Sequence, residues 1–286
     1  KEGHEGPVGI NLLEKVQLPN LYSIYGAMLA GVDYVIMGAG IPLEIPGILD
    51  RFSENKMAEL KLTVEGAGPE DNYRLCFDPH TFFESPPDGL KRPAFLPIVS
   101  SNVLAMIMMQ KASGKVDGLI VEENTAGGHN APPRGRMQFT EDGEPLYGPK
   151  DGINFEQLKK LGVPFWVAGH YGDDVKFEEA ISLGAQGVQV GTAFEFCEES
   201  GLSAEFKKKI METIKRGMSR VFTDPSVFEK EREVIFNKCW LYLGHESEIK
   251  NPKDYITRNI GGRNLIFNRD RHGNVHAFHN VCSHRG

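Results

Sequence analysis

Short runs of apolar residues alternate with longer amphipathic stretches over about the first 215 residues. The apolar runs predict β-strands at Val8–Asn11, Val32–Met37, Phe95–Ser100, Gly118–Glu122, Pro164–Ala168 and Gly187–Val190. The amphipathic stretches predict helices at Leu21–Ala30, Asn102–Lys111, Phe155–Leu161, Lys176–Leu183 and Ala204–Lys215. Strands that are apolar throughout are typical of parallel sheets, which are covered on both faces. The alternation therefore predicts an α/β fold, either a barrel or a doubly wound sheet.

The segment Glu65–Pro93 interrupts this alternation. It is rich in Pro, Gly and Asp and carries an aromatic cluster of Phe77, Phe82 and Phe83. A composition of this kind is typical of connections between elements. We interpret the segment as an excursion or lid inserted between two strand–helix units, with a solvated loop as the alternative.

The pattern changes after Gly217. Asp224-Pro225 is a typical helix start, because Asp caps the backbone and Pro is favoured at the first helical position, and the helix should run to about Phe236. Alternating stretches then predict antiparallel strands at Trp240–His245, Tyr255–Ile260, Asn264–Arg269 and Val275–Asn280, with a hairpin turn at 271–274. We predict two domains, residues 1–216 and 217–286, joined abruptly within 213–219 without a Pro/Ser-rich linker.

Composition narrows the function classes. The 286 residues are 40% hydrophobic and 25% charged, and the net charge is −7 with both signs mixed along the chain. A nucleic-acid-binding protein would need a basic face, so we expect no nucleic-acid partner. No apolar run approaches the roughly 18 residues of a membrane helix, so we expect no membrane partner.

The cysteines and the first residues bear on location. Four scattered cysteines do not form a disulfide framework, and the first residues do not have the pattern of a signal peptide, so we expect a cytoplasmic location. The chain starts with Lys1 rather than Met, and we expect it to begin inside a longer natural sequence.

The most informative chemistry in the first domain lies in the run 122–130, which contains Gly127, Gly128 and His129. The run follows a predicted buried strand, so it should lie on the barrel face that carries active sites. The glycines let a planar ligand approach the backbone. Histidine titrates near neutral pH and suits a general base or hydrogen-bond donor. On this motif alone, a surface or structural histidine is the alternative.

Two further runs follow the next predicted strands. Residues 167–172 contain Gly169, and residues 184–194 contain Gly191 and Thr192. In barrels the loops after the last two strands often bind phosphate, through backbone N–H groups and hydroxyls. Tight turns explain either run alone, whereas the two consecutive units together predict a phosphate site.

These motifs together resemble the nitronate monooxygenase family, also called 2-nitropropane dioxygenase-like flavoproteins, over about residues 6–215. The shared pieces are Gly9-Ile10-Asn11-Leu12, Gly31-Val32-Asp33, Gly38-Ala39-Gly40-Ile41-Pro42, Ala126-Gly127-Gly128-His129, Gly187-Val188-Gln189, Gly191-Thr192-Ala193-Phe194 and Glu199-Ser200-Gly201. The combination is specific, whereas each motif alone is not.

The resemblance implies a TIM barrel that binds FMN without covalent attachment and oxidises alkyl nitronates or nitroalkanes with O₂. It gives His129 the role of taking a proton from a nitroalkane or hydrogen-bonding the nitronate. The cofactor-binding residues that it implies are Gly127 and Gly128 beside that histidine, Gly169, Gly191 and Thr192 at the phosphate, and Gly38, Ala39 and Gly40 near the isoalloxazine ring. Flavin enoyl reductases share the barrel and the Gly-Gly-His motif, and their chemistry stays open here.

The resemblance is incomplete in two places. Family members have strands before Gly9, and the loop after the seventh strand usually carries a Gly-Gly pair where this chain has Gly169-His170. About six strands are found where a barrel needs eight. We therefore predict an incomplete TIM barrel that lacks its first strand or strands, with weak or absent FMN binding by this chain alone.

Residues from about 219 to 286 resemble the start of a Rieske-type aromatic-ring-hydroxylating dioxygenase large subunit. The matching residues are Phe222-Thr223-Asp224-Pro225, Trp240 through Ser247, Asn251-Pro252-Lys253-Asp254-Tyr255, and Asn280 through Gly286. In that family Cys282 and His284 would each ligate one iron. A [2Fe–2S] Rieske centre needs two Cys and two His, so this partial domain would hold a cluster only if a further Cys-x-x-His were supplied.

Three hypotheses follow. The chain is an FMN-dependent oxidoreductase of the nitronate monooxygenase type with an inactive tail, or it is a fragment of a Rieske oxygenase. The third is a chimera of two truncated domains without native activity. The first describes the descent of the parts best, and for the activity of this chain the first and third have equal weight.

Overall fold

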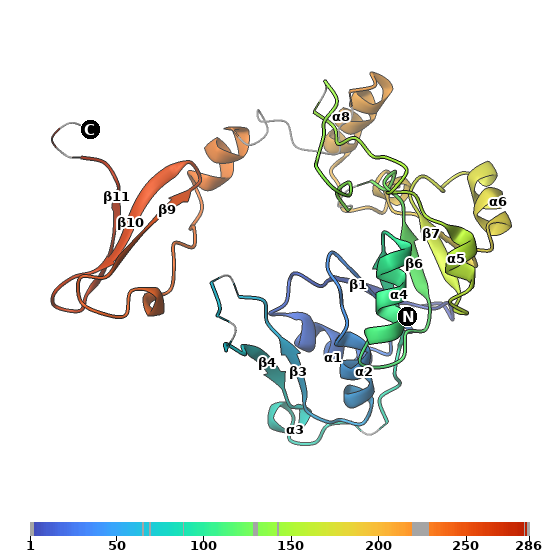
Figure 1. The fold of residues 1–286 in the computed structure, drawn as a ribbon, viewed down its shortest axis with the longest axis horizontal. Helices are drawn as coiled ribbons and strands as arrows, with labels where there is room; N and C mark the ends of the chain where they lie inside the picture. The colour runs from blue at the N-terminus through green and yellow to red at the C-terminus, as the bar shows by residue number, and fades with distance from the viewer. Residues whose placement is uncertain are drawn as a thin grey trace. The chain divides into compact units, whose positions relative to one another are not determined.

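The computed structural model describes two compact units, Lys1–Val221 and Phe222–Gly286, and each is considered by itself (Figure 1). The residues that it describes are 3–64, 66–68, 70–87, 89–127, 131–141, 143–218, 229–282 and 284. The predicted helix start at Asp224-Pro225 and part of the predicted junction at 213–219 lie outside these residues.

The first unit is built on a six-stranded parallel sheet. Its strands are β1 (Gly9–Leu13), β2 (Tyr34–Gly38), β5 (Ala94–Val99), β6 (Leu119–Glu122), β7 (Phe165–Ala168) and β8 (Gly187–Gln189), and they follow one another in that order across the sheet. The order never reverses, as in the wall of a barrel, whereas a doubly wound sheet reverses at a switch point. The prediction of an incomplete barrel with six strands is thereby confirmed, and β1 and β8 form the two edges of the described sheet.

Helices connect the parallel strands or follow the last of them. They are α1 (Asn20–Leu29), α2 (Ile45–Ser53), α4 (Asn102–Lys111), α5 (Phe155–Lys159), α6 (Asp174–Ser182), α7 (Thr192–Glu195) and α8 (Ala204–Lys215). All five predicted helices are confirmed, with shifts of a few residues at their ends. The sequence analysis missed α2, whose first turn contains Pro46 and Gly47. Both residues look like helix breakers, but Pro is tolerated in a first turn.

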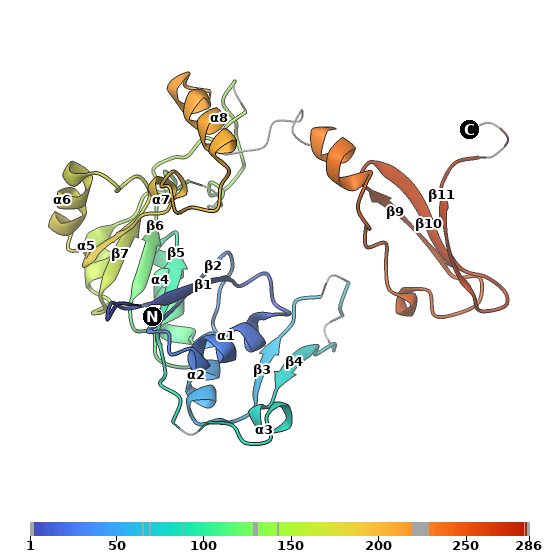
Figure 2. The same ribbon diagram turned by 180° about the vertical axis from the view of Figure 1, so that it is seen from behind.

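The two faces of the sheet differ in how they are covered (Figures 1 and 2). The convex face packs against the helices in one continuous core, whose largest fully buried side chains include Tyr25, Phe52, Phe95 and Met108. The concave face carries a smaller apolar cluster centred on Leu96, Ile120 and Ala168. A cavity of about 340 Å³ opens over this cluster. The concave surface is thus less filled than a closed barrel interior, which is packed with side chains.

The predicted excursion is present between two barrel units, and it is structured. It begins before Glu65, with an antiparallel hairpin of β3 (Ala58–Lys61) and β4 (Arg74–Phe77), followed by α3 (Pro79–Phe82). Phe77 is only 4% exposed, and its ring lies 5.1 Å from the Tyr22 and Tyr25 rings and 5.6 Å from the Phe52 ring. The solvated-loop alternative is therefore wrong, because aromatic packing ties the excursion to the main core.

The second unit is a small antiparallel sheet preceded by a helical segment. The described part of that segment, residues 229–236, is helical and ends in a π-helical turn at Arg232–Phe236. The sheet has the order β11 (Val275–His279), β10 (Arg263–Arg269) and β9 (Tyr255–Ile260). These strands and the turn at 271–274 confirm three of the four predicted strands and the hairpin.

The predicted strand Trp240–His245 is wrong. The segment has extended stretches but makes no ladder, and Trp240 is fully exposed. Its Leu243 carbonyl accepts a hydrogen bond from the Arg258 guanidinium at 2.5 Å instead of from a neighbouring strand. The apolar alternation is typical of a strand, but here the Arg258 side chain, rather than a neighbouring strand, satisfies the Leu243 carbonyl.

Candidate functional site

Loops at the carboxyl ends of β6, β7 and β8 meet in the first unit. A Cβ atom built on Gly127, after β6, would lie 2.8 Å from Thr192 Oγ1, after β8. A Cβ atom built on Gly169, after β7, would lie 2.9 Å from Thr125 Oγ1. The backbone at Gly169, with φ +117°, favours glycine, and a side chain at Gly127 would require Thr192 to move. The structure brings together Gly127, Gly169 and Thr192, and it leaves open space around Gly191.

Hydrogen bonds hold the loops after β6 and β7 to each other. Thr125 Oγ1 donates to the Gly169 carbonyl at 3.1 Å, and the buried Tyr171 hydroxyl donates to Glu123 Oε2 at 2.8 Å. Burial and the Glu123 carboxylate both raise the pKa of Tyr171, so this hydroxyl stays protonated. The loop leading from Glu123 to Gly127 is thus fixed against β7.

The backbone after β7 is unusual. Gly169 has φ +117° and His170 has φ +61°, in the left-handed region that side chains other than glycine rarely adopt. His170 stands where the resembling family usually has a glycine, so this chain accepts backbone strain there. The following helix α6 begins with Asp173, whose carboxylate accepts a hydrogen bond from Lys176 N at 2.9 Å, and with Asp174 in its first turn. Two carboxylates at a helix start disfavour an anion at that point.

Gly38, Ala39 and Gly40 follow β2 and are enclosed by their neighbours. A Cβ atom on Gly40 would lie 1.9 Å from Glu14 Oε2, and one on Gly38 would lie 3.0 Å from Ile98 Cδ1. Ala39 has φ +54°, again in the left-handed region. The tight turn therefore accommodates the Glu14 side chain. This packing requirement holds whether or not the three residues also contact a ligand.

Two predicted residues, Gly128 and His129, lie outside the described residues, together with Asn130. Their roles remain predictions. The described residue before them, Gly127, lies beside Thr192, and the chain from Ala131 onward leads to Asn154, just before α5. That segment is anchored to α4, because Asn154 N donates to Asn102 Oδ1 at 2.8 Å and Asn102 Nδ2 donates to the Asn154 carbonyl at 2.7 Å.

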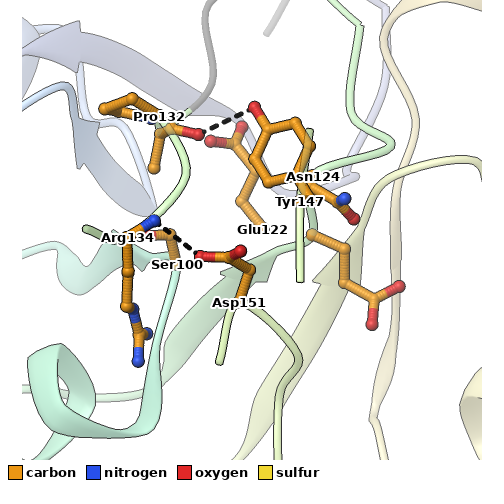
Figure 3. A pocket seen from close by; sticks show the side chains of 9 residues that line it. Ser100, Glu122, Asn124, Pro132, Arg134, Tyr147 and Asp151 are labelled. Atoms are coloured by element: carbon orange, nitrogen blue, oxygen red, sulfur yellow. Dashed lines mark hydrogen bonds between the residues drawn. The ribbon is translucent and has the colours of Figure 1, made fainter. Parts of the chain in front are cut away.

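Sequence reasoning missed a half-buried carboxylate at this end of the sheet. Glu122 is the last residue of β6 and is in register with Ala168 of β7, which is in register with Gln189 of β8. Glu122 lines a polar cavity of about 30 Å³ with Ser100, Tyr147, Arg134 and Asp151 (Figure 3). A carboxylate that ends the apolar run Leu119-Ile120-Val121 is the sequence signal that could have found it.

The segment between Ala131 and Asp151, which leads from β6 toward α5, forms one wall of this cavity. The Tyr147 hydroxyl donates to the Ala131 carbonyl at 3.0 Å, and Arg134 N donates to Asp151 Oδ1 at 2.8 Å, as the dashed lines in Figure 3 show. Burial raises the pKa of Glu122. Its carboxylate makes no hydrogen bond or ion pair with another side chain in the described part of the chain. The site therefore holds a carboxyl group whose charged form is disfavoured.

Gln189 is the third polar feature. Its Oε1 atom is buried and has no hydrogen-bond partner within the described residues, and the side chain lines the apolar cavity on the concave face with Ile36, Leu96 and Trp166. Buried polar atoms are almost always paired. An unpaired amide at the end of β8 is thus a position that a ligand or a further strand would satisfy.

Cys282 and His284 lie just after β11, and both are exposed. They provide one thiolate and one imidazole, half of the donors of a Rieske centre. Among the residues that the structure describes, no three or more His, Cys, Asp or Glu side chains gather to hold a metal ion. The described residues therefore do not by themselves fit a complete [2Fe–2S] cluster.

Two family models match parts of the chain. Residues 91–225 match the family model "Nitronate monooxygenase", and residues 239–286 match the model "Rieske [2Fe-2S] domain". The chain thus has a segment similar to nitronate monooxygenases followed by a segment similar to Rieske domains. Both resemblances drawn from the sequence are thus confirmed over these residues.

The curated relatives match the Rieske segment. The large subunit of anthranilate 1,2-dioxygenase from Acinetobacter baylyi is 50% identical over 66 residues, which are 23% of this chain and 14% of that protein. The carnitine monooxygenase oxygenase subunit from Acinetobacter baumannii is 46% identical over 65 residues, 23% of this chain and 18% of that protein. The chain thus spans less than a fifth of the length of these relatives.

A solved structure of a mutant of FabK from Thermotoga maritima covers 72% of this chain and 50% of its own chain, with 21% identity and a TM-score of 0.43. In the described residues, no helix has the length and apolar character needed to cross a membrane.

Proposed function

We propose that the nitronate monooxygenase segment is an FMN-dependent oxidoreductase that oxidises alkyl nitronates or nitroalkanes with O₂. The observation that carries the proposal is the close approach of Gly127 to Thr192 at the carboxyl ends of β6 and β8. It lies within the segment matched by the family model. Active sites of barrel proteins lie at this end of the strands, and phosphate is often bound by the loops after the last ones.

The described residues fit a flavin ligand in two respects. The backbone at Gly191 is open, since a Cβ atom there would meet nothing within 4 Å, and Gln189 offers a buried amide oxygen that has no partner among the described residues. Gly191 and Thr192 would hold the phosphate, because the start of α6 carries Asp173 and Asp174 and repels an anion. Gly169 would then contribute by letting the β7 loop pack against Thr125, and Gly38, Ala39 and Gly40 would face the ring system from β2.

In this proposal, His129 is the general base or hydrogen-bond donor. FMN, when bound, accepts electrons from the substrate and passes them to O₂. The histidine follows Gly127 and Gly128 directly, so it would take the α-proton of a nitroalkane or donate a hydrogen bond to the oxygens of a nitronate. A nitronate has already lost that proton, so the two substrates separate the base role from binding.

The experiment that tests the proposal is an absorption spectrum of the purified protein, with release of the bound chromophore by denaturation. Released FMN supports the function, and nitronate oxidation is then measured by O₂ consumption. His129→Ala should lower turnover of nitroethane at least tenfold more than turnover of ethyl nitronate, in line with the roughly 10²–10⁴-fold contribution of general base catalysis. Equal loss on both substrates would exclude the base role.

The Rieske segment motivates a second proposal. Its resemblance to ring-hydroxylating and carnitine oxygenases covers Cys282 and His284. We propose that these two residues ligate iron only when a further Cys and His are supplied. Iron and acid-labile sulfide content of this chain should then be far below two of each per molecule, whereas a full complement would contradict the proposal. A colourless protein of the expected mass would favour a chimera of two truncated domains.

A further inference from the structure

Glu122 is a carboxyl group that neither the fold nor the proposed roles account for. It ends β6 on the concave side of the sheet, beside the small side chain of Ala168. Its neighbour Glu123, one residue on, also lines the cavity but accepts a hydrogen bond from the Tyr171 hydroxyl. Two adjacent carboxylates are thus placed in different environments, one paired and one not, which is the arrangement by which proteins divide acid and base roles between carboxyl groups.

The cavity beside Glu122 connects it to polar groups and has room for solvent. Its volume of about 30 Å³ exceeds the ~15 Å³ that one water needs, and at least two polar partners are required to hold that water. Ser100 and Asn124 supply uncharged polar groups to the same cavity. A proton could thus pass between Glu122 and solvent through this space.

The charged and titratable groups facing Glu122 are few. Arg134, Tyr147 and Asp151 come from the segment after Ala131, and Glu123 comes from the loop that directly follows Glu122. Tyr171 and His170 follow β7, which pairs with β6. Burial is the physical cause that raises the pKa of Glu122, and no cation among these groups offsets it.

We propose that Glu122 is a second acid–base residue of this site, which exchanges a proton with the substrate by way of the cavity that it shares with Tyr147 and Ser100. The inference rests on the proposed function and adds a proton donor to it. The step transfers only a proton. The carboxyl O–H bond breaks as a water in the cavity accepts the proton, that water loses one of its protons to a substrate oxygen, on which the new O–H bond forms, and the carboxylate regains a proton from solvent. No electrons are exchanged.

The first test needs no flavin. A carboxyl group that keeps its proton longer in the folded than in the unfolded state makes the protein less stable as pH rises from the unfolded pKa toward the folded pKa. The unfolding equilibrium constant should therefore rise with pH above about 4.3, the ordinary Glu value, and by up to tenfold per pH unit for one group. Glu122→Gln should remove this rise, and Glu123→Gln, the matched control, should keep it.

The measurement uses the whole chain with Trp240→Phe, so that Trp166 on β7 reports unfolding of the first unit alone. Urea midpoints are compared between pH 4.5 and 7.5. A wild-type slope that persists in Glu122→Gln overturns the proposal.

The second test is the pH profile of turnover with FMN bound. Glu122→Gln should retain FMN and lose one limb of the profile, and an unchanged profile overturns the acid–base role. If no FMN is bound, the proposed function fails and this role falls with it. The pH slope of stability then still shows whether Glu122 carries the proton, so the two failures are distinguished.

Discussion

The contact between Gly127 and Thr192 makes a quantitative prediction. A Cβ atom on Gly127 would lie 2.8 Å from Thr192 Oγ1, about 0.7 Å closer than the ~3.5 Å at which non-bonded atoms rest. Gly127→Ala therefore forces the Thr192 side chain or the loop to move. Overpacking costs roughly 1–3 kcal/mol in well-packed sites, and because both residues here are exposed we expect about 1 kcal/mol.

A second effect of Gly127→Ala has the opposite sign. Replacing a glycine reduces the entropy of the unfolded chain and stabilises by about 0.4–1 kcal/mol where the backbone is compatible. The single substitution can thus appear neutral. A double-mutant cycle with Thr192→Ala removes this contribution, because it is common to both backgrounds. The coupling energy should be about 1 kcal/mol, with Gly127→Ala costing more when Thr192 is present.

The assay is urea unfolding followed by Trp166 fluorescence in the Trp240→Phe background. The control cycle pairs Thr192→Ala with Gly148→Ala, since a Cβ atom on Gly148 meets no other atom within 4 Å. That cycle should be additive within about 0.5 kcal/mol. Additivity in the Gly127 cycle as well would refute the reasoning, because the loops after β6 and β8 would then not meet.

Two further predictions concern the scaffold. Phe77→Ala should destabilise the first unit by about 3–5 kcal/mol in urea unfolding, because the Phe77 side chain is 4% exposed. The control Phe82→Ala should cost less than about 1 kcal/mol, because Phe82 is 63% exposed. Equal costs would show that the β3–β4–α3 excursion is not part of the core. Asp117 accepts hydrogen bonds from the Phe95 amide at 2.9 Å and from Arg92 Nη1 at 2.7 Å. Burial alone would raise the pKa of Asp117, but the hydrogen bonds from Lys115, Phe95 and Arg92 outweigh it and hold the pKa below its ordinary value. A carboxyl group whose pKa is lowered on folding stabilises the folded state at pH values above its unfolded pKa, and this stabilisation is lost as the pH falls below about 4. Asp117→Asn should therefore cost about 1–3 kcal/mol of stability at pH 7 and progressively less below pH 4. A difference that does not depend on pH would contradict the assignment.

The parallel sheet was predictable because its inner strands are apolar on both faces. Runs such as Leu119-Ile120-Val121 leave no polar face, and only a sheet covered by helices accommodates them. The sequential strand order needed the structure, since apolar runs do not encode their neighbours. Trp240–His245 shows the limit of pattern reasoning, because the Leu243 carbonyl is satisfied by Arg258, a residue 15 positions away.

The candidate site, like the fold, could be predicted from the sequence only in part. The glycines at 127 and 169 stood out as residue types, but only the coordinates show that they are required by Thr192 and Thr125. Glu122 was overlooked because charged residues at strand ends usually face solvent. Its burial follows from the excursion that starts at Ala131 and folds back over β6, a long-range arrangement that the local sequence does not specify.

The central claim is that the loops after β6 to β8 form a flavin site in the first unit. The most direct measurement is the visible absorption spectrum of the purified chain before and after denaturation, together with the flavin-to-protein ratio after adding FMN. Because an incomplete barrel should bind FMN weakly, the account predicts that added FMN has a perturbed spectrum in the folded protein and that this perturbation is lost on unfolding, with still weaker binding in Gly127→Ala. A protein that stays colourless and does not bind added FMN would contradict it.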